Sequence, residues 1–202
     1  MPGVTDLKAQ MAFYGAYHSN ATNVTIHRIC VPFIQWSAQV LLTLLATNPS
    51  WFPAFHYQLG PYIQFEFNWA AVQAIIYVLY FTVLHPTGAL FYLPQQALSV
   101  GTAIAFAHRA PNALVIASVV QTCTWIAQFI GHGKFEGRAP ALLDNIVGAL
   151  VLAPFFVHLE NLFDLGWNPK LHKEVQNAIG VEVTRFRRAE GDKKRAEATR
   201  KQ

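Results

Sequence analysis

The sequence predicts an all-α integral membrane protein: a bundle of about four transmembrane helices, plus a C-terminal helix that packs on it or lies in the membrane interface. Of the 202 residues, 53% are hydrophobic and only 13% are charged, whereas soluble domains carry about 25% charged residues. Between Ile29 and His108 there is no Lys or Arg, and Glu66 is the one acidic residue. A charge at the bilayer centre costs about 2.5 to 3.5 kcal/mol, so this uncharged stretch indicates segments that cross a membrane.

Four apolar segments approach the roughly 20 residues that a helix needs to cross the hydrocarbon. They lie at about Cys30–Thr47, Trp69–His85, Thr87–Ala107 and Ala113–Gly131. Pro86 separates the second from the third, because its ring disrupts a continuing helix. The longer link over residues 48–68 is rich in aromatic residues and Pro. We expect this link at the headgroup level, which Trp and Tyr prefer.

A fifth apolar run begins at Pro140 and is uninterrupted only over residues 146–157, which is short for a span. We expect a helix over about 140–163 that packs against the bundle or lies in the interface, and a fifth crossing stays open. Asp144 stands near the start of this run, where an acidic side chain suits the positive end of the helix dipole.

The chain divides into a single multi-span membrane domain over residues 1–168 and a basic tail over 169–202. The tail holds ten of the fifteen Lys and Arg residues. We expect it to meet anionic lipid headgroups rather than nucleic acid, because aromatic residues are sparse in it. The positive-inside rule places the tail in the cytosol, and four spans place the N-terminus there too.

Two further patterns bear on this placement. The acceptor patterns Asn20-Ala-Thr22 and Asn23-Val-Thr25 would be glycosylated in a lumen and the glycans would bury the histidines beside them, so they also favour a cytosolic N-terminus. The first 27 residues lack a continuous apolar core, so no cleavable signal peptide is expected. Cys30 and Cys123 both lie in apolar runs and are interpreted as free thiols.

This topology brings three histidines to one face of the membrane. They are His18 and His27 before the first span, and His132 after the fourth. Neutral imidazole is a good ligand for Fe, Zn and Cu. Three such side chains at one face therefore favour a metal site, although a hydrogen-bonded structural role is the alternative for each one alone. His85 reaches the same face by topology only, while His56 and His108 fall on the opposite side.

The local sequence allows the first two histidines to meet. Nine positions apart, they would lie on opposite faces of one continuous helix. The intervening polar residues 19–23 signal a turn, with Asn23 a plausible N-cap, so the chain can fold back there. His132 stands between Gly131 and Gly133, where we expect a helix to end and Gly133 to prevent its continuation to Glu136.

Three stretches of the chain, FYGAYHSNATNVTIHRICVPFI, PTGALF and WIAQFIGHGKFEGRAPALLDNIVGALVLAPFFVHLE, resemble the endoplasmic-reticulum 2-hydroxy-fatty-acid dioxygenases. The resemblance covers about residues 6–167. It implies an enzyme of the endoplasmic reticulum membrane that uses Fe2+ and O2 to shorten a 2-hydroxy fatty acid by one carbon, in the α-oxidation that serves phytosphingosine breakdown. The family's histidines map onto His18, His27 and His132. Ser19 stands where some members carry a second histidine.

The chemistry of the residues suits this reaction. A hydroxyl and a carboxylate on adjacent carbons can chelate a metal, which then acts as template and Lewis acid. A cation must meet the carboxylate, and Arg138 is the favoured clamp because Arg can donate two parallel hydrogen bonds. Lys134 and Arg28 are further candidates, and all three can instead be interfacial side chains that snorkel. Glu136 could bind iron, orient a ligand histidine or pair with Arg138.

Two other functions stay open. A haem protein would need histidine pairs that face each other inside the membrane, and the absence of a Soret band would exclude it. A non-catalytic lipid-binding protein would need an apolar cleft and no metal set. A transporter is less favoured, because paired broken helices are not evident.

Overall fold

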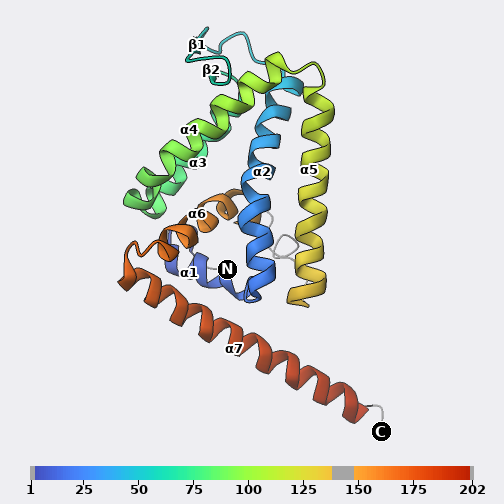
Figure 1. Cartoon of the computed structure of the whole chain (residues 1–202). Coiled ribbons are helices and arrows are strands. Elements are labelled where there is room, and N and C mark those ends of the chain that lie inside the picture. Colours follow the sequence, from blue (N-terminus) through green and yellow to red (C-terminus); the bar gives the residue numbers. More distant parts are fainter. Residues whose placement is uncertain (1–2, 138–147, 201–202) are drawn as a thin grey trace.

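The computed structural model describes residues 3–137 and 148–200, and within them the chain is mostly helical (Figure 1). The helices are α1 Leu7–Ala16, α2 Ala21–Leu45, α3 Trp69–Leu84, α4 Pro86–Arg109, α5 Ala113–Ile130, α6 Ala153–Asp164 and α7 Pro169–Arg200. Two π-helical turns, Gly131–Glu136 and Gly148–Leu152, and two short strands, β1 His56–Gln58 and β2 Gln64–Glu66, complete the described elements. The predictions at Arg138, Pro140 and Asp144 fall outside the described residues.

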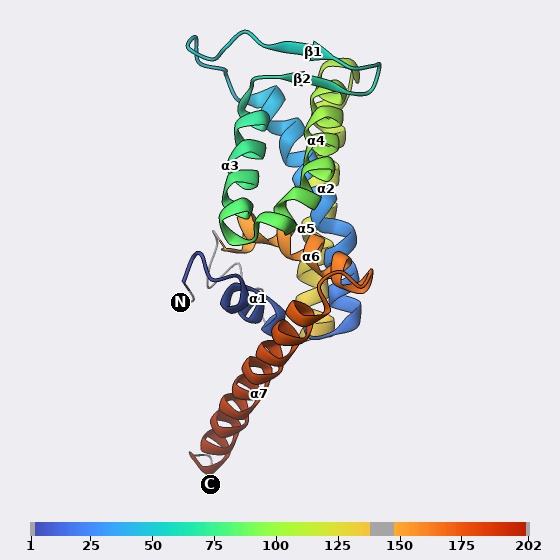
Figure 2. The same ribbon diagram turned by 90° about the vertical axis from the view of Figure 1, so that its left-hand side faces the viewer.

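Helices α2 to α5 lie side by side and form the bundle, as Figures 1 and 2 show from two directions. α5 packs along α2, and α4 packs against both α2 and α3. Small residues let these helices approach closely: Ala103, Ala107, Ala113 and Ala117 are buried against Val40. The second predicted segment, Trp69–His85, agrees with α3 to within one residue.

The first helix of the bundle begins earlier than the sequence suggests. α2 starts at Ala21, because the side chain of Asn20 accepts hydrogen bonds from the backbone N–H groups of Thr22 and Asn23. The interpretation of Asn23 as the N-cap is therefore wrong, since Asn23 lies inside the helix and is fully buried. His27 consequently belongs to α2 rather than to a segment that precedes it.

The expectation of a purely helical chain is corrected in the link between α2 and α3. There β1 and β2 pair antiparallel, with His56 opposite Glu66. This hairpin caps one end of the bundle (Figure 2). His108, at the end of α4, contacts Glu66 with 2.9 Å between Nε2 and Oε2. His56 and His108 thus lie at the end of the bundle opposite to α1, as the topology predicts.

The main hydrophobic core lies at the other end, where α1, α6 and α7 pack beneath the bundle. Phe155 and Phe156 of α6 are almost fully buried, and Phe155 stacks on Phe81 of α3 with 4.5 Å between ring centroids. Burying one such side chain stabilises a fold by about 1.5 to 3 kcal/mol. α6 therefore packs into the core rather than lying free at a surface.

The first half of α7 packs against α1, although the sequence assigns this segment to the tail. Val175 is buried in the main core and Ile179 lies against it. The approach is close at Gly15, where a Cβ atom would lie 2.4 Å from Cδ1 of Ile179. The second half of α7 carries most of the basic residues of that helix and projects away from the bundle (Figure 2).

Two helical segments of the described chain, Ala21–Leu45 and Ala113–Glu136, are long and apolar enough to cross a membrane. Trp69–Leu84 is apolar but shorter. Length and composition alone are weak evidence for a membrane span, since the core helix of a soluble protein also meets these criteria.

Candidate metal centre

The three predicted histidines meet where α1, α2 and the end of α5 come together. His18 lies in the short link after α1, His27 lies nearly two turns into α2, and His132 lies in the π-helical turn that extends α5. The ring centroids of His18 and His27 are 4.3 Å apart, and each lies 4.9 Å from that of His132. One potential ligand atom from each residue lies within 4.8 Å of the others, so the group could hold a single metal ion.

All three rings are buried, with exposed fractions of 8% for His18, 4% for His27 and 3% for His132. Nδ1 of His18 lies 2.7 Å from the backbone carbonyl of Tyr14, and Nδ1 of His27 lies 2.9 Å from that of Asn23. When Nδ1–H donates to a carbonyl, Nε2 is left as the ligand atom, which is the usual arrangement around metal-bound histidines.

The state of His18 also suits a ligand. Burial lowers the pKa of His18 well below its ordinary value, and the neighbouring His27 lowers it further. The imidazole is therefore neutral near pH 7, as a metal ligand must be. Nε2 of His18 is buried and has no hydrogen-bond partner among the described residues. A buried nitrogen lone pair of this kind fits a metal ion, because leaving it unsatisfied costs about 1 to 3 kcal/mol.

A π-helical turn carries His132. The sequence suggests that the helix stops at Gly133. In the structure it continues instead as a wider turn from Gly131 to Glu136 and ends at Gly137. Gly137 has a φ of 66°, a left-handed conformation that favours glycine. Turns of this type are frequent at functional sites. A Cβ atom on Gly131 would lie 2.4 Å from Oδ1 of Asn23, so glycine allows this turn to approach α2.

The carboxylate of Glu136 holds the link between α1 and α2 in place. It accepts hydrogen bonds from the backbone N–H of Ser19 at 2.9 Å, the hydroxyl of Ser19 at 2.5 Å, the backbone N–H of Asn20 at 3.0 Å and the side-chain amide of Asn23 at 3.1 Å. Glu136 thus secures the residues directly after His18. The catalytic role assigned to Glu136 from the sequence stays a prediction, and this geometry favours a positioning role.

The candidate cations have different surroundings. Arg28 forms an ion pair with Asp164, and its Nε lies 3.7 Å from Glu160, so its charge is already compensated. Lys134 is exposed and lies over the ring of Phe135. Arg138 is outside the described residues, so its proposed clamp stays a prediction.

Other nearby side chains shape the site. The ring of Tyr14 stacks on His18 with 3.9 Å between centroids, and so covers one face of the imidazole. His85, which topology alone allows at the centre, instead caps α4 by accepting a hydrogen bond from the backbone N–H of Gly88 at 3.0 Å.

Two residues of this region were missed at the level of sequence. Asn23 is buried, and it joins α2 to Glu136 through its side chain and to His27 through its carbonyl. Gln128, one turn before His132, is 8% exposed. In the sequence, each of these amides stands four positions before a candidate histidine ligand. Side chains with this spacing lie on the same face of a helix, so the pattern could have identified both residues as neighbours of the site.

The chain is similar to known proteins over most of its length. The family described as "2-hydroxy-palmitic acid dioxygenase Mpo1-like" matches residues 4–165. A protein of Saccharomyces cerevisiae named "2-hydroxy-palmitic acid dioxygenase MPO1" is 33% identical over 186 residues, which cover 92% of this chain and 96% of that protein. No solved structure matches the chain. The chain therefore belongs to the Mpo1-like family, and the resemblance inferred from its histidine-containing stretches is confirmed.

Proposed function

We propose that this chain is a 2-hydroxy-fatty-acid dioxygenase that uses Fe2+ and O2 to shorten its substrate by one carbon. The observation that carries the proposal is the convergence of His18, His27 and His132, all buried, into one group that could hold a metal ion. The family and the yeast relative named above support the same activity.

The three histidines fit iron chemically. Neutral imidazole nitrogens suit iron, and three such ligands leave open positions for substrate and oxygen. When bound, the metal supplies a Lewis acid and a template for the hydroxyl and carboxylate oxygens of the substrate. The carbonyls of Tyr14 and Asn23 orient two of the rings, and the stacked ring of Tyr14 excludes water from one face of His18. We retain Arg138 as the proposed clamp for the carboxylate.

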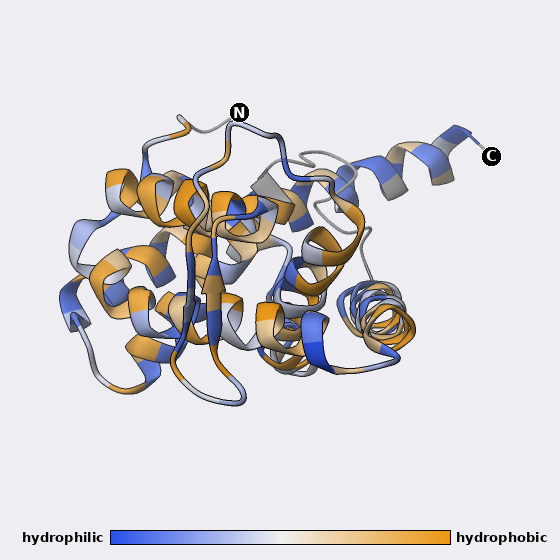
Figure 3. Cartoon of the chain, turned by 90° about the horizontal axis from the view of Figure 1, so that it is seen from above, coloured by the Kyte–Doolittle hydropathy of each residue, from blue (hydrophilic) through white to orange (hydrophobic). Residues whose placement is uncertain are grey.

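The exposed side chains of the bundle support a membrane location. Large apolar residues project outward from all four bundle helices, and hydrophobic positions are spread over the bundle while α7 is mostly hydrophilic (Figure 3). They include Ile29, Phe33, Leu79, Val83, Leu90, Leu98, Val115 and Val119. Soluble monomers rarely expose apolar patches larger than a few hundred Å². We propose that α2 to α5 all span the bilayer.

The two ends of the bundle support an orientation. Exposed aromatic residues at the hairpin end, among them Trp51, Tyr57 and Tyr62, suit one membrane interface. The basic half of α7 suits an anionic surface at the other end. We propose that this second end, with both termini and the histidines, faces the cytosol, and that the membrane is that of the endoplasmic reticulum.

The decisive experiment is anaerobic Fe2+ reconstitution of the detergent-purified chain, followed by metal analysis and incubation with 2-hydroxypalmitate and O2. We expect about one iron per chain and a product one carbon shorter. Zinc-loaded protein serves as the control and should be inactive. Iron uptake without turnover would contradict the activity, and neither uptake nor turnover would favour the non-catalytic lipid-binding alternative. The haem alternative is disfavoured because ring centroids 4.3 to 4.9 Å apart leave no room for a porphyrin between them.

A further inference from the structure

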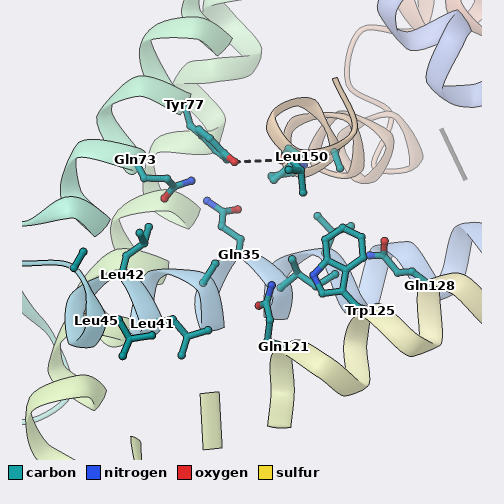
Figure 4. A pocket seen from close by; sticks show the side chains of 16 residues that line it. Gln35, Leu41, Leu42, Leu45, Gln73, Tyr77, Gln121, Trp125, Gln128 and Leu150 are labelled. Carbon is teal, nitrogen blue, oxygen red and sulfur yellow. Dashed lines mark hydrogen bonds between the residues drawn. The ribbon is translucent and has the colours of Figure 1, made fainter. Parts of the chain in front are cut away.

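A cavity of about 530 Å³ lies between α2, α3 and α5, and residues of the Gly148–Leu152 turn and of α6 complete its lining (Figure 4). This volume is within the range of about 300 to 1,000 Å³ that is usual for small-molecule sites. Most of its lining is apolar, and a few glutamines contribute polar atoms. The α2 residues in its wall are Val31, Ile34, Gln35, Ala38, Leu41, Leu42, Leu45 and Ala46. Their spacing of three and four positions marks one continuous face of the helix.

One end of the cavity adjoins the three histidines. Val31 lies four residues after His27, and Gln128 lies four residues before His132. Side chains four apart on a helix are neighbours. The cavity therefore begins one helical turn from two of the three candidate ligands, on the side that leads into the bundle.

The length of the cavity wall suits a long acyl chain. From Val31 to Ala46, α2 rises by about 22 Å at 1.5 Å per residue. An extended alkyl chain advances about 1.25 Å per carbon, given C–C bonds of about 1.5 Å at near-tetrahedral angles. The wall can thus accommodate an extended chain of about 17 carbons.

Gln128 differs from the other glutamines in the cavity wall. Gln35 is hydrogen-bonded to Tyr92 and Gln96, Gln73 accepts from Gln39 at 2.8 Å, and the amide of Gln121 is hydrogen-bonded to the hydroxyl of Ser37 at 2.6 Å. The side-chain nitrogen of Gln128 is buried and meets no acceptor among the described residues. An unsatisfied buried donor is costly, and an oxygen of a bound ligand would satisfy it.

We propose that this cavity is the acyl-chain slot of the substrate, and that the amide of Gln128 donates a hydrogen bond to the substrate carboxylate. The inference rests on the proposed function, and it adds where the 2-hydroxy acid binds and a second residue, besides Arg138, that contacts its head group. The carboxylate end lies beside the histidines, and the alkyl chain runs along α2 towards Ala46.

Blocking the slot half-way tests the path of the chain. Ala38 lies seven residues, or about 10 Å, beyond Val31, which leaves room for about eight carbons. We expect Ala38→Phe to lower the affinity for 2-hydroxypalmitate at least about tenfold relative to that for 2-hydroxyoctanoate. Binding is measured on the metal-free chain in lipid nanodiscs, so the result does not depend on turnover. Ser118→Phe, which adds the same bulk on the exposed face of α5, should keep the wild-type preference.

Replacing the amide tests the head-group contact. We expect Gln128→Leu to raise the KM for 2-hydroxypalmitate about 10- to 100-fold, which corresponds to the loss of one hydrogen bond to a charged group, while iron content stays unchanged. Gln58→Leu, which removes an exposed amide from β1 at the hairpin end of the bundle, is the control and should leave KM near the wild-type value.

The outcomes separate the slot from the activity. An unchanged chain-length preference in Ala38→Phe would overturn the assignment of the cavity as the acyl-chain slot. A bilayer lipid that occupies the cavity of Ala38→Phe and Ser118→Phe alike would also overturn it. An unchanged KM in Gln128→Leu would overturn the head-group contact. If the wild-type chain binds 2-hydroxypalmitate with the expected length dependence but does not turn it over, the slot stands and the proposed activity fails.

Discussion

The side-chain amide of Asn23 donates a hydrogen bond to the carboxylate of Glu136 across 3.1 Å, although the two residues are 113 positions apart in the chain. The backbone carbonyl of the same asparagine lies 2.9 Å from Nδ1 of His27. Asn23 thereby ties the orientation of one candidate ligand to the turn that carries another, His132. This contact joins α2 to the π-helical turn that extends α5.

Removal of any one of the three histidines should abolish iron binding and activity. We expect His18→Ala, His27→Ala and His132→Ala each to lose bound iron and to lower turnover of 2-hydroxypalmitate more than 100-fold, because two imidazoles hold a divalent ion weakly. Metal analysis and product formation by purified protein are the measurements. His56→Ala, at the opposite end of the bundle, is the matched control and should retain both. An active, iron-containing His132→Ala would contradict the assignment of the centre.

The two glycines beside His132 should respond differently to the same added methyl group. Gly131→Ala places a Cβ atom 2.4 Å from Oδ1 of Asn23, whereas at Gly133 no atom of the described residues lies within 4 Å of the added atom. We expect Gly131→Ala to destabilise the fold by about 1 to 3 kcal/mol and to weaken iron binding about 10- to 100-fold. Gly133→Ala should bind iron normally, with stability equal or up to about 1 kcal/mol higher. Thermal unfolding and iron titration of the pair decide this, and equal behaviour of the two variants would refute the proposed close approach.

Glu136 should act by positioning the link that follows His18. Glu136→Ala removes the acceptor of four hydrogen bonds, and we expect a loss of about 1 to 3 kcal/mol in stability together with weaker iron binding. Iron that does bind should keep its wild-type ligand-field spectrum. Glu182→Ala, which removes an exposed ion-pair partner on α7, should cost less than about 1 kcal/mol. A changed iron spectrum at unchanged stability would make Glu136 a metal ligand instead.

The buried carboxyl of Glu160 should make stability depend on pH. Burial raises the pKa of Glu160 from 4.5 to about 7, although Arg28 lowers it in part. The folded chain therefore keeps this proton between pH 4.5 and 7 while the unfolded chain releases it, so the ionised group lowers stability as pH rises. The unfolding free energy of Glu160→Gln should therefore rise relative to that of the wild type from pH 4.5 upward. The difference should reach about 3 kcal/mol above pH 7, because each pKa unit corresponds to about 1.4 kcal/mol.

The measurement for Glu160 is the difference in Tm between the two proteins from pH 4 to 8.5. Arg28 keeps Asp164 as a partner in this variant, so the loss of its second partner should not mask the effect. Glu182→Gln, at a partly exposed position of α7, supplies the baseline. A Tm difference that is constant over the whole range would contradict the raised pKa.

Features that depend on local chemistry could be predicted closely. α3 matches the apolar run that begins at Trp69, and α4 begins at Pro86, because hydropathy and proline geometry act within a few residues. The extension of α2 back to Ala21 was missed, because its first turns are polar and carry no apolar signal. The continuation of the helix past Gly133 was missed for a related reason, since the contacts between Glu136 and the link after His18 outweigh a local preference to stop.

The sequence by itself determined the mostly helical fold and the family, and it singled out the three histidines that converge in the structure, because composition, apolar runs and short motifs carry that information directly. Only the tertiary structure decided how the histidines are held. The contact of Asn23 with Glu136, the close approach at Gly131 and the place of Gln128 beside the cavity each join α2 to α5 or its extension. Residues more than a hundred positions apart meet there through packing, and no local pattern in the chain encodes the distance between them.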